Sequence, residues 1–240
     1  RRSSDLVNIM KMSDFQCLIE KNSDYKDVCL TILLILQVLT IFIISPVTES
    51  EHKNYHWLNN ALFSAMALIS VFIVSKDIKR YLAILSFSFC LVGLAVGSTT
   101  TTHKTTGVLV LLSGIFFCLN VSWIVAKQVF DEGVVTLHRI RGAMVIYLNI
   151  SLLFALLDCL LVGFIPDAYT GISDDNSIET MLYFSLTTLT TLGYGDILAI
   201  HPFARNLAML EAVMGQFYMG TMIAILVGLH IAQRTPASKK

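Results

Sequence analysis

The segment Thr187-Thr188-Leu189-Thr190-Thr191-Leu192-Gly193-Tyr194-Gly195-Asp196 is the most informative stretch of the chain. Two of its residues, Gly193 and Gly195, are glycines that alternate with larger residues. Glycine accepts left-handed backbone angles that other residues resist. The alternation therefore predicts an extended backbone that leaves ordinary strand geometry and turns consecutive carbonyl oxygens toward one axis.

A short apolar run, residues 178–189, comes directly before this segment. Its pattern predicts a helix, but about a dozen residues are too few to cross a bilayer, which takes about 17 to 25. We therefore expect this helix to dip into the membrane and return. Because it ends near Thr190, the negative end of its dipole points toward the glycine segment and favours a cation there.

The composition of the whole chain is that of a membrane protein. Of its 240 residues, 55% are hydrophobic and only 14% are charged, which excludes an ordinary soluble domain. Six runs are long enough to span a bilayer, and they cover residues 28–45, 58–75, 81–97, 107–126, 143–165 and 203–230. The predicted fold class is an all-α membrane protein with six transmembrane helices and one re-entrant helix followed by an extended segment.

The distribution of positive charge orients these helices. A cytoplasmic N terminus leaves only Lys53, Lys104 and Arg205 of the 17 Lys and Arg residues outside, as the positive-inside rule requires. Both termini are then cytoplasmic. The predicted divisions are a cytoplasmic N-terminal segment (1–27), a four-helix membrane domain (28–126), an interfacial linker (127–142), a pore domain (143–233) and a cytoplasmic tail (234–240). A polar loop is the alternative for the linker.

The string Thr191-Leu192-Gly193-Tyr194-Gly195-Asp196 resembles the selectivity filter of the potassium channel superfamily. The resemblance implies a homotetramer that holds K⁺ in a filter formed by Thr191, Leu192, Gly193, Tyr194 and Gly195, through backbone carbonyls and the Thr191 hydroxyl. It implies that the filter is supported by Asp196, Tyr183, Phe184, Thr187 and Thr190. Two positions depart from the family pattern: Leu192 replaces the commoner valine, and Thr187 stands where some members carry an acid that pairs with the filter aspartate. Asp196 is therefore expected to bond to Tyr183, to backbone or to water.

Three further residues are candidates for gating or support. Gly215 lies nineteen residues after Asp196, where the family carries a hinge glycine, and close helix packing is the alternative. Glu211 and Asp158 are acids inside predicted spanning helices, where charge is costly. A buried hydrogen bond is the expected role of each acid, with a threonine of the re-entrant helix as an example of a partner for Glu211. The run 107–126 lacks the regularly spaced Lys or Arg of voltage-gated relatives, so voltage gating is not expected.

Other functions fit the sequence less well. A weakly selective cation channel, or a pore subunit gated by a further or partner cytoplasmic domain, is the alternative that stays open. A secondary potassium transporter needs four filter repeats in one chain, and an enzyme needs a nucleophile–base pair, phosphate loop or metal cluster that the sequence does not offer. Zero net charge gives no reason to expect nucleic acid. The expected partners are other copies of the chain and membrane lipids, and the expected location is the plasma (inner) membrane. We expect K⁺ in the filter and no organic cofactor.

Overall fold

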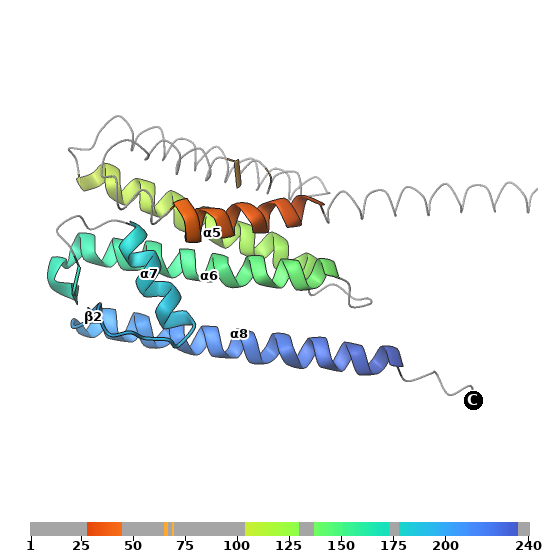
Figure 1. Ribbon diagram of the computed structural model, residues 1–240. Helices are drawn as coiled ribbons and strands as arrows, with labels where there is room; N and C mark the ends of the chain where they lie inside the picture. Colours follow the sequence, from red (N-terminus) through yellow and green to blue (C-terminus); the bar gives the residue numbers. More distant parts are fainter. Residues whose placement is uncertain are drawn as a thin grey trace, which may run out of the picture.

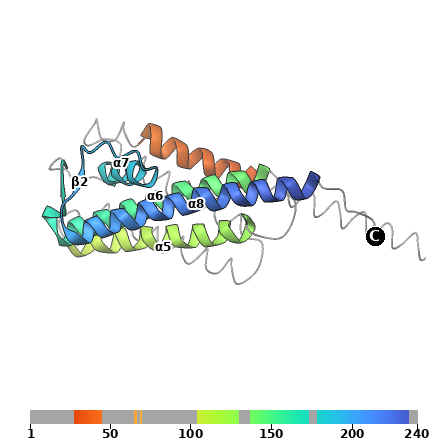
Figure 2. The ribbon, with the colours of Figure 1, turned by 90° about the horizontal axis from the view of Figure 1, so that it is seen from below.

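The computed structural model describes residues 28–44, 65, 66, 69, 104–129, 137–172 and 178–234. In this part of the chain three long helices lie side by side, α5 (Lys104–Val129), α6 (Leu137–Phe164) and α8 (Pro202–Arg234). A shorter helix, α7 (Ile178–Leu189), lies at one end of the bundle, as Figures 1 and 2 show. The fold of the described residues is therefore helical, as predicted.

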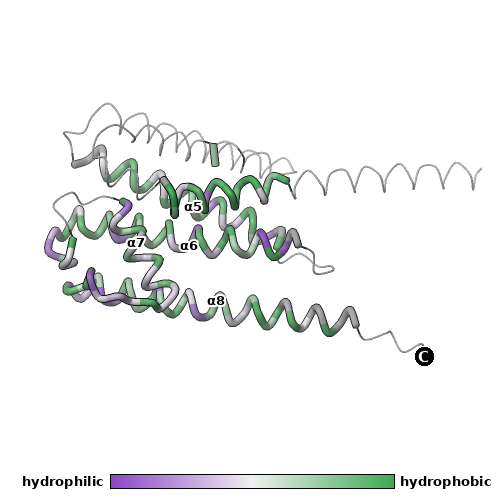
Figure 3. The backbone as a smooth tube through the Cα atoms, viewed as in Figure 1, coloured by the Kyte–Doolittle hydropathy of each residue, from purple (hydrophilic) through white to green (hydrophobic). Residues whose placement is uncertain are grey.

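Among the described residues, three helices are long and apolar enough to cross a membrane, with candidate spans at Gly107–Lys127, Arg139–Phe164 and Pro202–Ile225. The predicted runs 107–126, 143–165 and 203–230 fall on them. A shorter apolar helix, Val28–Ile43, falls on the predicted run 28–45 and ends in a π-helical stretch, η1 (Thr40–Ile44). Figure 3 shows the mainly hydrophobic character of these helices. The predicted runs 58–75 and 81–97 lie outside the described residues, apart from residues 65, 66 and 69.

The two ends of the predicted linker 127–142 are helical, and its place at the membrane surface stays a prediction. Residues 127–129 continue α5, and α6 already begins at Leu137. The polar residues at the start of α6 therefore belong to the helix, where Arg141 Nη1 donates to Thr31 Oγ1 at 2.9 Å. This bond joins the start of α6 to the helix Val28–Ile43.

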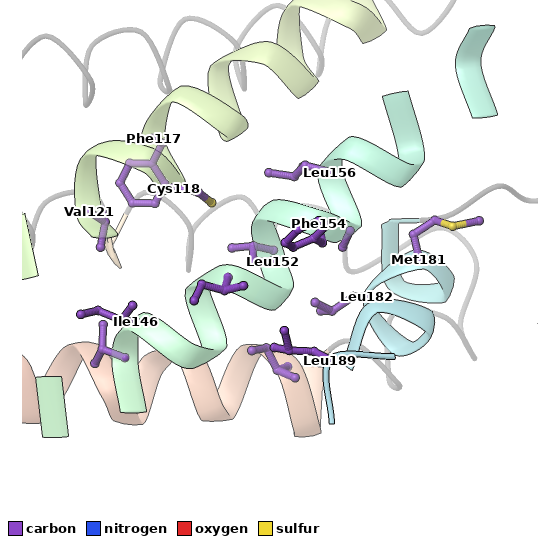
Figure 4. Packing of buried hydrophobic residues seen from close by; sticks show 14 of the residues in the cluster. Phe117, Cys118, Val121, Ile146, Leu152, Phe154, Leu156, Met181, Leu182 and Leu189 are labelled. Carbon is purple, nitrogen blue, oxygen red and sulfur yellow. The ribbon is translucent and has the colours of Figure 1, made fainter. Parts of the chain in front are cut away.

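Helix α6 is the centre of the described bundle. Figure 4 shows core side chains of α5, among them Phe117 and Cys118, on one side of α6, and Met181 and Leu182 of α7 on another. The buried Asn149 of α6 fastens it to α5, because its Nδ2 donates to the Cys118 carbonyl at 2.6 Å and lies 2.7 Å from Ser122 Oγ. Such interhelical amide bonds are worth about 0.6 to 2 kcal/mol in membrane proteins.

The chain between α6 and α7 forms a small outer turn. A short 3₁₀ helix, η2 (Pro166–Ala168), leads into β1 (Tyr169–Thr170), which pairs antiparallel with β2 (Leu198–Ala199). Strand β2 lies between the glycine segment and α8. This pairing returns the chain from the glycine segment to the same end of the bundle at which α6 finishes.

Helix α8 is the least covered of the three spanning helices. Only 17% of its spanning part is buried, against 61% for that of α6. Large apolar side chains such as Phe217 and Phe203 are exposed along it. In a membrane such a helix is free to contact lipid, a pore or another subunit.

Candidate functional site

The C-terminal end of α7 holds the start of the glycine segment. The carbonyl oxygen of Thr187 accepts hydrogen bonds from the backbone N–H groups of both Leu192 (2.8 Å) and Gly193 (3.1 Å). The Thr190 hydroxyl donates to the Leu186 carbonyl at 2.6 Å, and the Thr191 N–H donates to the Thr188 carbonyl at 2.9 Å. These bonds cap the helix end and fix the direction in which the next residues leave it.

The backbone of the glycine segment alternates in handedness. Positive φ angles occur at Thr191 (58°), Gly193 (52°) and Gly195 (82°), but not at the residues between them. Alternating left- and right-handed residues turn successive N–H groups to one side, so successive carbonyls face the other side. In an ordinary strand they would alternate. The angles expected at Gly193 and Gly195 are therefore present.

The left-handed angle at Thr191 was not expected from the sequence. A β-branched residue adopts this conformation at a cost of about 1–3 kcal/mol, and such strain persists only where the surroundings impose it. Here the hydrogen bond from Thr191 N–H to Thr188 and the two bonds to the Thr187 carbonyl impose it. Strained backbone at this point is a sign that its geometry serves a function.

All residues of the segment from Thr191 to Asp196 are exposed. No atom lies within 4 Å of a Cβ placed at Gly193 or Gly195, so one side of the backbone is open in the single chain. The side chains of Leu192 and Tyr194 line a hollow of about 670 Å³ beside α7, together with Ile41 and Phe42. An extended backbone left uncovered in this way is incomplete without further contacts.

The residues expected to support the filter fall into two groups. Tyr183 stacks on Tyr194, with ring centroids 6.4 Å apart and an interplanar angle of 2°. The Tyr183 hydroxyl also forms a hydrogen bond with the Asp196 carboxylate, so Asp196 has one of the partners expected for it. Phe184 lies on the buried side of α7 and contacts Tyr169 edge-on, with the two ring centroids 5.3 Å apart. Phe184 thus supports the outer turn.

The Thr191 hydroxyl links the segment to α8. It donates to the Thr190 carbonyl at 2.7 Å and lies 3.3 Å from Gln216 Nε2, which donates to it. Thr191 and Gln216 line a groove of about 870 Å³ that runs along α8 past Phe217 and Thr221. Gln216 was not predicted as a site residue. The available signal was its spacing of one helical turn from Ala212 and Gly220, which places all three on one face of the predicted last helix.

Gly215 lies where α8 touches α7. A Cβ at this position would be 2.3 Å from the Leu189 carbonyl oxygen and 3.0 Å from Leu189 Cδ1. The packing alternative for this glycine is therefore supported by geometry, whereas a hinge is a statement about movement and stays a prediction. Helix α8 runs from Pro202 to Arg234 as one element.

The two acids expected inside the membrane are fully buried. Asp158 accepts a hydrogen bond from the Tyr169 hydroxyl at 2.6 Å, so it ties α6 to the outer turn. Glu211 Oε1 is hydrogen-bonded to Ser185 of α7. The expected kind of interaction is present, and the pore-helix partner is a serine, not a threonine.

Comparison with known proteins agrees with this arrangement. Residues 143–230, which include most of α6, all of α7, the glycine segment and most of α8, match the family model described as "Ion channel". No curated protein and no solved structure matches the chain. The family match and the apolar helices together support a membrane protein of an ion channel family of the potassium channel type.

Proposed function

We propose that the chain is one subunit of a potassium-selective channel in which four copies surround a single conduction path. Each copy contributes the carbonyl oxygens of Thr191, Leu192, Gly193 and Tyr194, with Gly195 and Asp196 closing the outer end. The observation that carries this proposal is the alternation of left-handed angles at Thr191, Gly193 and Gly195, because it turns successive carbonyls to one side of the backbone.

Potassium is the cation that such a segment suits. Rings of neutral carbonyl dipoles replace the hydration shell of K⁺ and release it again, whereas rings of carboxylates favour other cation selectivities. The carbonyl end of α7 adds a partial negative charge beside Thr191. The Thr191 hydroxyl provides an oxygen at the inner end, where Gln216 holds it in place.

Fourfold assembly follows from the number of filter strands. One chain contributes one strand, so a closed cage of carbonyls needs further copies arranged around an axis. The exposed segment, the open hollow beside α7 and the poorly covered α8 support this arrangement. Within it, the groove along α8 faces the conduction path below the filter.

The remaining parts of the proposal concern location and gating. The positive-inside pattern supports a plasma (inner) membrane location with cytoplasmic termini. Between Gly107 and Ala126, α5 carries no Lys or Arg, which supports a channel that is not gated by voltage. A weakly selective cation channel is the competing function, and it is distinguished by selectivity alone.

The experiment compares ion uptake into lipid vesicles that contain the purified protein. We expect uptake of K⁺ far above that of Na⁺, and loss of this preference in Gly193→Ala, because alanine resists a φ of 52°. Gly163→Ala in α6 is the matched control, since a Cβ there meets no atom within 4 Å. Native mass measurement of the same protein should give four copies. Equal K⁺ and Na⁺ uptake, or active particles of one or two chains, would refute the proposal.

A further inference from the structure

Helix α8 contacts the rest of the described chain through one narrow stripe. Between Pro202 and Met222 the positions covered at least in part lie along one face of the helix, and they are Ala204, Leu207, Ala208, Glu211, Ala212, Gly215, Tyr218 and Met222. Small residues in such a stripe let membrane helices approach closely. Glu211 is the only acid in it and is completely buried, so the cost of placing a carboxyl group there must be offset by its contacts.

These contacts are arranged in two layers. In the first, Ser185 of α7 lies between Ser151 of α6 and Glu211 of α8. Four residues away, earlier in α6 and later in α7 and α8, the Leu189 carbonyl lies between the Tyr147 hydroxyl, at 3.4 Å, and Gly215. Because residues four apart share a helix face, α7 is held between α6 and α8 at two successive turns.

The single hydroxyl proton of Ser185 bears on the protonation state of Glu211. Two acceptors are within reach of this proton, the Ser151 carbonyl oxygen at 2.7 Å and Glu211 Oε1. If the proton goes to the Ser151 carbonyl, Ser185 Oγ can only accept from its other neighbours, and Ser151 Oγ, 3.1 Å away, has a proton to donate. The contact with Glu211 Oε1 is then satisfied only if the carboxyl group carries a proton. If the proton goes to Glu211 instead, the acid is an ionised carboxylate whose second oxygen is buried.

The surroundings of Glu211 agree with a neutral group. Its other oxygen, Oε2, is buried without a hydrogen-bond partner among the described residues. An isolated buried carboxylate would cost far more than a neutral acid. The titratable groups on the packed elements that interact electrostatically with Glu211 are Tyr147 and Asp158 of α6 and Tyr169 of the outer turn.

We propose that Glu211 is a positioning residue that retains its proton and donates it to Ser185, so that the pore helix α7 is anchored to the pore-lining helix α8. This inference rests on the proposed channel function and adds the means by which the filter is held in register. Only a few residues separate this anchor from the filter, because Ser185 lies two residues before Thr187, whose carbonyl binds the N–H groups of Leu192 and Gly193.

Permeability measurements test the positioning role. We expect Glu211→Gln to keep the K⁺/Na⁺ permeability ratio within about twofold of the unmodified protein, since the amide can still donate to Ser185. Glu211→Ala and Ser185→Ala should each lower the ratio about tenfold, the effect of one lost hydrogen bond that leaves its partner buried. The double variant should be no worse than the more affected single one. The control is Ser113→Ala in α5, another buried serine, whose hydroxyl donates to the Val110 carbonyl of its own helix and to no other described residue.

The outcomes separate the two proposals. If the unmodified protein has no K⁺ preference, the proposed function fails. If the preference is present but Ser185→Ala and Glu211→Ala retain it, or if Glu211→Gln is as impaired as Glu211→Ala, the anchoring role is refuted.

Infrared difference spectroscopy at neutral pH tests the proton without requiring a working channel. The carbonyl stretch of a protonated carboxylic acid should be present in the unmodified protein, disappear in Glu211→Gln and shift in Ser185→Ala, because that variant removes the hydrogen-bond partner. Asp158→Asn provides the reference for the other buried acid. A spectrum in which Glu211→Gln removes only carboxylate bands would overturn the proposal.

Discussion

Substitution of Gly215 by alanine gives a sharp test of how α8 supports the filter. The added Cβ would lie 2.3 Å from the Leu189 carbonyl oxygen, whereas real Cβ contacts essentially never fall below 3.0 Å. That oxygen belongs to the backbone at the end of α7 and cannot rotate away. The two helices must therefore separate by about 0.7 Å, at a cost of about 1–3 kcal/mol, which is typical of overpacking.

The displacement should reach the conduction path, because Leu189 lies two residues before Thr191. We expect Gly215→Ala to lower the K⁺/Na⁺ permeability ratio about tenfold in single-channel recordings, as about 1.4 kcal/mol of lost preference would. Gly220→Ala is the control on the same helix, since a Cβ there meets no atom within 4 Å. If Gly215→Ala changes open probability and leaves the ratio intact, the packing account is wrong and the hinge interpretation is correct.

Three further changes follow from the described contacts. Tyr183→Phe removes the hydrogen bond with Asp196 but keeps the ring that stacks on Tyr194. Sustained K⁺ current should therefore decay faster, and an unchanged decay would show that this hydrogen bond does not support the filter. Asn149→Leu removes the hydrogen bonds to α5 and should lower the free energy of unfolding in lipid by about 0.6–2 kcal/mol. An unaltered midpoint of the unfolding transition would show that these bonds contribute nothing to stability. Currents should also lack steep voltage activation, because α5 carries no Lys or Arg between Gly107 and Ala126 that could move through the membrane field. Each elementary charge that crosses the field supplies only about 2.3 kcal/mol per 100 mV, so steep activation needs several such charges. Measurable gating currents would refute this prediction.

The helices were predictable where the sequence carries a local signal. The re-entrant helix was expected at 178–189 and α7 has these bounds, because a polar glycine segment follows it directly. The ends of α6 were predicted less well. Hydropathy marks the part of a helix inside the hydrocarbon, whereas the hydrogen-bonded helix continues through Arg141 and Arg139 to Leu137.

The candidate site was predictable at the glycines and less so at their neighbours. The sequence favoured left-handed angles at Gly193 and Gly195, since few other residues adopt them readily. It gave no such indication for Thr191, whose angle depends on the hydrogen bonds that Thr187 and Thr188 accept from the following residues. The sequence suggested a partner for Glu211 on the re-entrant helix but not that this partner is Ser185, because the choice depends on how α7 packs between two other helices.

The most direct test of the central claim is the reversal potential of the purified protein in a planar bilayer with K⁺ on one side and Na⁺ on the other. The account predicts a reversal potential set by K⁺, and a collapse of that potential toward zero in Gly193→Ala. A potential near zero in the unmodified protein, with current flowing equally well in both directions, would contradict a potassium-selective filter at Thr191–Gly195.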